Sequence, residues 1–101
     1  MKPAEVARLI EGIDGWLTIG QALRLADAAA AAPAAATIVE IGSFRGRSTV
    51  VLATAAPSDA VIVAIDPHAG NDRGPRELDG YHAAAATDRE LFERNLVDAG
   101  V

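Results

Sequence analysis

The chain has 101 residues and a mass of 10.4 kDa, which fits one small domain and excludes a two-domain enzyme. Half of the residues are hydrophobic but only 4% are aromatic, so the composition predicts a core of aliphatic side chains and excludes a disordered chain. Lys and Arg total 9 against 14 Asp and Glu, and the net charge of −5 repels phosphate backbones and anionic lipid. We therefore expect no nucleic-acid partner.

The sequence also indicates in which cellular compartment the protein resides. It contains no cysteine, which excludes disulfides, thiolate metal sites and cysteine nucleophiles. Its longest run without a charged residue, 28–39, is far shorter than the ~20 apolar residues of a membrane span. No continuous apolar stretch of the signal-peptide kind follows the first residue. These features predict a cytoplasmic protein with no membrane partner.

Two helices are expected before the first strand. An apolar stripe at helical spacing predicts a short amphipathic helix over 3–13. Thr18 then precedes a second apolar and Ala-rich segment and is a candidate N-cap. That helix is expected to run to about residue 32, because Pro33 cannot continue it.

Two short β-branched runs, 37–41 and 60–65, predict strands. Because the runs are continuously apolar, they suit strands covered on both faces, as in a parallel sheet. Residues 48–56 between them have helical character. The order strand, Gly-containing turn, helix, strand predicts a βαβ crossover.

A last helix is expected over about 83–99, ending at Gly100. The sequence therefore predicts one partial α/β domain, with N-terminal helices over 1–33 and a cofactor-binding βαβα unit over 37–101. Two parallel strands leave both sheet edges open. Either the chain is a fragment or a partner completes the sheet, and a homo-oligomer is one such arrangement.

The stretch 39–49 says most about function, because a strand there runs into a Gly-containing loop and the start of a helix. Open α/β sheets bind ligands at such strand ends. Three residues separate Gly42 from Gly46 and no Lys follows, so the phosphate-binding P-loop pattern is not met. Phe44 stands where the dinucleotide fingerprint needs glycine. Asp66, at the end of the next strand, is placed to accept hydrogen bonds from both ribose hydroxyls, which favours a nucleoside without phosphate.

The sequence resembles the class I S-adenosylmethionine-dependent methyltransferases, in their O-methyltransferase-like branch. The resemblance rests on Val39-Glu40-Ile41-Gly42, Gly46, Ser48, Ala53-Thr54-Ala55-Ala56-Pro57 and Val63-Ala64-Ile65-Asp66, with Thr18 and 95–101 in matching positions. It implies a Rossmann-like parallel-sheet methyltransferase fold, interrupted after the second βα unit and preceded by N-terminal helices. It also implies an enzyme that transfers a methyl group from S-adenosylmethionine to a small-molecule nucleophile such as an oxygen.

The resemblance implies a cofactor site that comprises Thr18, Glu40, Gly42, Ser43, Ser48 and Asp66. The backbone at Gly42 and Ser43 would approach the amino-acid part of S-adenosylmethionine, and Glu40 and Ser48 would help hold its charged groups. Asp66 would bind the ribose, and Thr18 would close over the site from the N-terminal helices. No metal is expected, and no catalytic residue is identified.

Plain structural roles stay open for these residues: a loop amide as partner of Glu40, and helix caps for Ser48 and Thr18. Trp16 is expected as a core anchor rather than an aromatic wall for adenine or substrate, and the arginines at 45 and 47 are expected on the surface. The segment 67–80 is a candidate lid.

Two other functions remain possible from the sequence: a non-catalytic nucleotide-binding or interaction module that pairs through an open sheet edge, and an NAD-dependent oxidoreductase.

Overall fold

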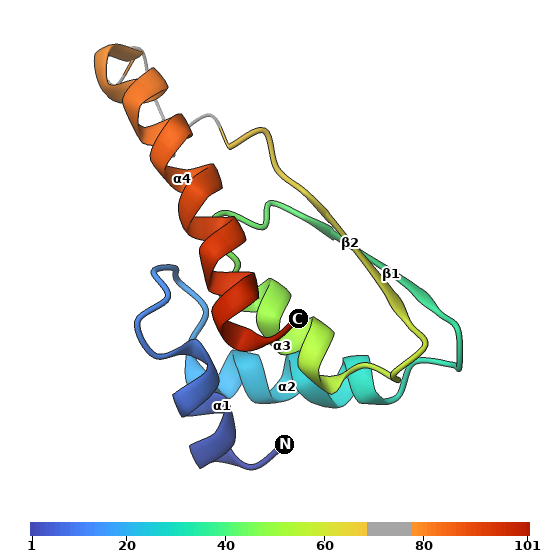
Figure 1. Ribbon diagram of the computed structural model, residues 1–101. Coiled ribbons are helices and arrows are strands. Elements are labelled where there is room, and N and C mark those ends of the chain that lie inside the picture. Colours follow the sequence, from blue (N-terminus) through green and yellow to red (C-terminus); the bar gives the residue numbers. More distant parts are fainter. Residues whose placement is uncertain (69–77) are drawn as a thin grey trace.

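The computed structural model describes residues 1–68 and 78–101, and for 78–86 only the course of the backbone. The elements follow in the order α1 (Pro3–Ile10), α2 (Ile19–Ala30), β1 (Thr37–Ile41), α3 (Arg47–Ala55), β2 (Val61–Ile65) and α4 (Leu78–Ala99) (Figure 1). These residues form a small α/β unit, compatible with a Rossmann-like arrangement. Most of the segment expected as a lid lies outside the described residues.

Local signals place the two N-terminal helices. Pro3 opens α1, and the Glu5 carboxylate accepts a hydrogen bond from the backbone N–H of Lys2 at 2.7 Å. The helix ends at Ile10, earlier than the apolar stripe predicts, because the chain turns at Gly12 with a φ of 76°. Thr18 caps α2 as predicted, and α2 ends at Ala30, two residues before its expected limit.

The two strands pair in parallel, as predicted. Thr37 lies beside Val61 and the register continues to Ile41 beside Ile65. Helix α3 connects the strands and begins after Gly46, which is its N-cap, so the alternative of Ser48 as a helix cap is wrong. Helix α4 begins several residues before its predicted start and ends at Ala99, next to Gly100, as predicted. Among the described residues no helix has the length and apolar character of a membrane span.

The fully buried core lies among the helices. It is aliphatic, as the composition predicts, and its main cluster consists of Val6, Ile10, Ile13, Ala22, Ala26, Val50 and Val51. Neither strand contributes a fully buried residue. On the covered face of the sheet, Ile62 and Ala64 are half-buried beside Phe92 of α4.

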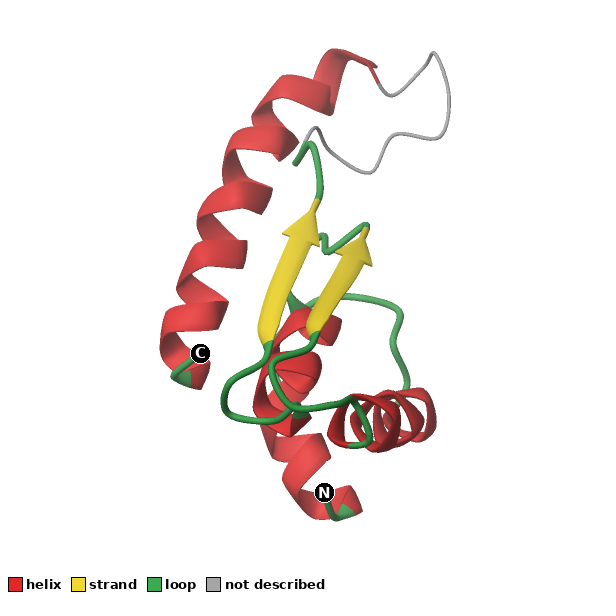
Figure 2. Cartoon of the chain, turned by 90° about the vertical axis from the view of Figure 1, so that its right-hand side faces the viewer, coloured by secondary structure: helices red, strands yellow, loops and turns green. Residues whose placement is uncertain are grey.

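The opposite face of the sheet is bare. Apolar side chains alternate along both strands, and those of one face are exposed: Val39, Ile41, Val61, Val63 and Ile65. In Figure 1 the helices lie on one side of the strands, and Figure 2 looks onto the strands with no helix in front of them. The expectation that both faces are covered is therefore wrong for the described part of the chain.

Candidate functional site

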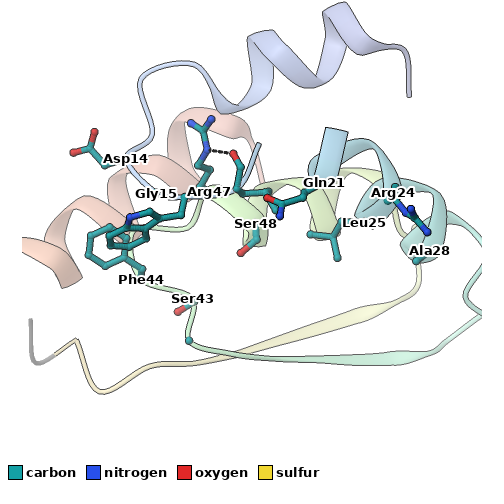
Figure 3. Close-up of a pocket in the computed structure, with 13 residues that line it drawn as sticks. Asp14, Gly15, Gln21, Arg24, Leu25, Ala28, Ser43, Phe44, Arg47 and Ser48 are labelled. Carbon is teal, nitrogen blue, oxygen red and sulfur yellow. Dashed lines mark hydrogen bonds between the residues drawn. The ribbon is translucent and has the colours of Figure 1, made fainter. Parts of the chain in front are cut away.

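A groove of about 720 Å³ opens beside the carboxyl end of β1. Its walls come from the loop between α1 and α2, from one side of α2, and from the loop and first turn that follow β1. Figure 3 shows Phe44 near one end of the row of lining side chains, Arg24 and Ala28 at the other end, and Ser48 and Leu25 between them. The groove thus lies between the N-terminal helices and the loop after β1, two of the three regions in which the sequence predicts cofactor-binding residues.

The two glycines of the loop have different tasks. Gly46 has a φ of 91°, and a Cβ there would lie 2.9 Å from Leu96 Cδ1, so only glycine lets α4 pack this closely. Gly42 has a φ of 88°, but a Cβ there would meet no atom within 4 Å. The backbone at Gly42 is therefore open to the groove, where a ligand can approach it.

Ser43 carries a polar group that lacks a partner. The residue lines the groove but is only 3% exposed, and among the described residues nothing hydrogen-bonds to its Oγ. Buried hydroxyls in folded proteins nearly always have a partner. Ser43 Oγ is therefore a hydrogen-bonding position that a ligand of the groove can use.

Glu40 is held by the first turn of α3. One carboxylate oxygen accepts a hydrogen bond from Ser48 Oγ and the other accepts one from Thr49 Oγ1, both at 2.5 Å. These bonds satisfy a carboxylate that lies half-buried on the covered face of the sheet. The structural alternative of a loop amide is wrong, because hydroxyls are the partners, and sequence reasoning missed Thr49. Glu40 reaches the groove only through Ser48, which lines it.

Asp66 ties the end of β2 to the loop after β1. Its Oδ2 accepts a hydrogen bond from the backbone N–H of Phe44 at 2.8 Å, and its Oδ1 accepts one from the N–H of His68 at 2.7 Å. A carboxylate has about four lone-pair positions, so these bonds orient Asp66 and leave acceptor capacity for a ligand. Asp66 does not line the groove, although Phe44, which it binds, does.

Thr18 is the N-cap of α2. Its Oγ1 accepts from the backbone N–H of Gln21 at 3.2 Å, and Gln21 Oε1 accepts from the Thr18 N–H at 3.0 Å. Its neighbours Leu17 and Gln21 line the groove, but Thr18 does not. The structure thus brings Gly42, Ser43 and Ser48 together in the groove, with Glu40, Asp66 and Thr18 behind its walls.

Arg45 and Arg47 both bind groups of the segments that form the groove. The prediction that they are ordinary surface residues is therefore wrong. Arg47 donates from Nε to the carbonyl of Leu17 at 2.8 Å (dashed line in Figure 3), and from Nη1 to the carbonyls of Ile10 at 2.8 Å and Ile13 at 2.7 Å. Ile10 is the last residue of α1, and Ile13 and Leu17 belong to the segment between α1 and α2. Arg47 therefore holds that segment against the start of α3.

Arg45 connects the groove loop to two other regions. It donates from Nε to Asp88 of α4 at 2.8 Å and from Nη1 to Asp14 at 2.5 Å. Burial lowers the pKa of Arg45, but the hydrogen bonds and charges of Asp88 and Asp14 raise it more, so the pKa lies above its usual value. Asn95 also donates to the Arg45 carbonyl at 2.9 Å, so α4 holds the loop at two points.

Trp16 does not anchor the core. The residue is 70% exposed, and its ring lies 5.4 Å from the ring of Phe44, centroid to centroid. The predicted core role of Trp16 is therefore wrong. Trp16 and Phe44 instead form one wall of the groove, which we call the aromatic wall.

His68 lies three residues after the end of β2. Its ring lies 5.1 Å from that of Phe92, and its Nδ1 is 4.0 Å from Asp66 Oδ1. In the described part of the chain, no group of three or more His, Asp or Glu side chains is arranged to hold a metal ion.

No protein-family model matches the chain, and no curated protein matches it either. We therefore infer the ligand of the site from the geometry described above.

Proposed function

We propose that this chain is the cofactor-binding part of an S-adenosylmethionine-dependent methyltransferase with a Rossmann-like fold, which methylates a small-molecule nucleophile such as an oxygen. The observation that carries the proposal is the hydrogen bond from the Phe44 N–H to Asp66. It joins an acid at one strand end to a glycine loop at the neighbouring strand end. Ligands of open α/β sheets bind at this edge.

The residues present fit such a cofactor. Asp66 has free acceptor positions for the ribose hydroxyls and is held in place by two backbone amides. The open backbone at Gly42 and the unpaired hydroxyl of Ser43 suit the amino-acid part. Glu40 fixes Ser48 at the groove, and Thr18 fixes the helix that forms the opposite wall.

S-adenosylmethionine, when bound, supplies a methyl group that is already activated. The protein's share of the work is then to bind, to align the acceptor and to exclude water. The groove has an aromatic end formed by Trp16 and Phe44, and Ser48 and Leu25 line its middle, which suits that task. Methylation of a hydroxyl would also release its proton to solvent, and no described residue is assigned as an acid or base.

The proposal is tested by isothermal titration of the chain with S-adenosylhomocysteine, after circular dichroism has established that the chain is folded. We expect saturable binding in the micromolar range. The variant Asp66→Ala should weaken it by about 2–4 kcal/mol, because a charged acceptor of two hydroxyls is lost. Asp59→Ala is the matched control, because Asp59 is an exposed carboxylate before β2, at the other end of the strand.

Asp66 also holds the loop, so the circular dichroism of the variant must match that of the parent chain. A folded Asp66→Ala variant with undiminished affinity would refute the proposal. The same titration with NADH separates it from an NAD-dependent oxidoreductase. Binding of NADH in place of S-adenosylhomocysteine would favour the oxidoreductase.

One observation favours a second candidate, an interaction module that pairs through the sheet. The exposed sheet face is apolar apart from Thr37, and contiguous apolar surface of this kind is typical of protein contacts. Such a module needs no ligand in the groove. It predicts that the face, and not the groove, determines how the chain associates.

A further inference from the structure

Phe44 has a backbone conformation that its surroundings must enforce. Its φ is 49°, in the left-handed region that bulky residues rarely adopt. In this conformation the main-chain N–H of Phe44 donates to Asp66 Oδ2 at 2.8 Å. Strained backbone of this kind persists where surrounding contacts hold it in place. The contacts that hold Phe44 therefore also determine how Asp66 is oriented.

The next residue along the chain, Arg45, makes contacts that can hold Phe44. Its guanidinium lies 5.0 Å from the ring centroid of Phe44 in the aromatic wall. Arg45 Nε donates to Asp88 Oδ1 at 2.8 Å, and the Arg45 carbonyl accepts from Asn95 Nδ2 at 2.9 Å. Asp88 and Asn95 both belong to α4. This helix therefore holds both the side chain and the backbone of the residue that follows Phe44.

The two carboxylates that bind Arg45 differ in burial. The side chain of Asp14 is 73% exposed, whereas that of Asp88 is 3% exposed. Exposed ion pairs contribute little, because solvent screens the charges and the side chains lose entropy when they pair. Separating a buried ion pair is far more costly, because it leaves an uncompensated charge away from water. Asp88 is therefore the partner that fixes Arg45, and with it the loop after β1.

We propose that Asp88 is a positioning residue for the cofactor site: through Arg45 it keeps the Phe44 N–H where that group orients Asp66 toward the ribose of S-adenosylmethionine. This inference rests on the proposed function. Asp88 does not line the groove, and its connection to Asp66 runs through the two loop residues. The inference makes α4, none of whose described side chains lines the groove, a support of the cofactor site.

Such a support differs in a measurable way from simple anchoring of α4. If Asp88 acts through Asp66, its loss weakens the hold on the ribose hydroxyls and spares the other contacts of the ligand. If Asp88 only anchors α4, its loss lowers the fraction of binding-competent chain. That loss reduces the affinity of every ligand by the same factor. The ratio of the affinities of two ligands that differ in one ribose hydroxyl therefore separates the two roles.

The experiment measures the affinity of the whole chain for S-adenosylhomocysteine and for its 2′-deoxy analogue by isothermal titration. In the parent chain we expect the two affinities to differ roughly ten- to a hundredfold, because the analogue lacks one hydroxyl bound to a charged acceptor. Asp88→Ala should lower this ratio about threefold or more. Asp88→Asn should lower it by a smaller factor, because an amide oxygen still accepts a hydrogen bond from Arg45. Asp98→Ala removes an exposed carboxylate of the same helix and is the matched control, so it should leave the ratio unchanged.

The outcomes separate this inference from the function on which it rests. If the parent chain does not bind S-adenosylhomocysteine, both fall. If it binds and a folded Asp88→Ala variant keeps the ratio of the parent, the inference is overturned and the proposed function stands. If Asp88→Ala does not fold, Asp88→Asn decides, and an unchanged ratio in that variant overturns the inference. An equal fall of the ratio in Asp98→Ala would overturn it too, because the effect would then not depend on Arg45.

Discussion

The helices α1 to α3 and the two-stranded sheet obtain their stability in different ways. The helices bury Val6, Ile10, Val50 and Val51 almost completely against one another. The strands bury no residue completely, and one whole face of apolar side chains is exposed. The helical part therefore has its own core, whereas the sheet depends on the helices behind it.

This difference explains where the candidate site lies. The groove forms where the two parts meet, and its loop is fastened to the helical part by Arg47 and to the sheet by Asp66. Glu40 is the one charged residue of the strands, and it too bonds to α3. Polar contacts thus join the helical part to a sheet that contributes no fully buried residue.

The largest expected effect comes from placing the same charge in each part. Val50→Asp buries an unpaired carboxylate at a site with 0% exposure and should destabilise the chain by more than about 4 kcal/mol. Val61→Asp places the same charge at a site with 56% exposure and should cost less than about 1 kcal/mol. Urea denaturation followed by circular dichroism measures both. Equal losses would mean that the bare face is as well packed as the helical core.

A smaller effect is expected at the fastening between the parts. Arg47→Met keeps much of the apolar stem but leaves the carbonyls of Ile10, Ile13 and Leu17 without their shared donor, at a cost of about 3 kcal/mol. Arg94→Met, at an exposed position of α4, is the matched control and should change stability by less than about 0.5 kcal/mol. Because Trp16 lies in the segment that Arg47 holds, the NMR signal of its ¹⁵N-labelled indole N–H should also move in the Arg47→Met variant. An unmoved signal would contradict this role.

Features set by neighbouring residues were predictable from the sequence. The bounds of β1, the cap at Thr18 and the end of α4 follow from propensity and turn chemistry within a few positions. The parallel pairing follows from the length of the crossover between the strands. The bare face could not be foreseen, because a continuous apolar run looks the same whether one or both of its faces are covered.

Contacts between residues far apart in the sequence could not be predicted in this way. Arg47 binds carbonyls that are 30 to 37 positions away, and Arg45 binds a carboxylate 43 positions away. Backbone carbonyls belong to every residue, so no sequence pattern marks them as partners. The sequence predicts Trp16 as a core anchor, yet the turn around Gly15 places it beside Phe44. The sequence thus allowed us to predict which residue types lie at the site. It did not show which of them line the groove and which hold its walls in place.

The smallest effect on stability, and the one most specific to the sheet, is expected on its bare face. Val61 and Val63 are 56% and 39% exposed. The double variant Val61→Thr, Val63→Thr keeps the β-branched shape, so stability should change by less than about 1 kcal/mol. Removing apolar surface from the face should, however, lower any self-association that sedimentation velocity detects in the parent chain. If association persists unchanged in the variant, the contact lies elsewhere, and the bare face loses its claim to be the surface through which the chain pairs.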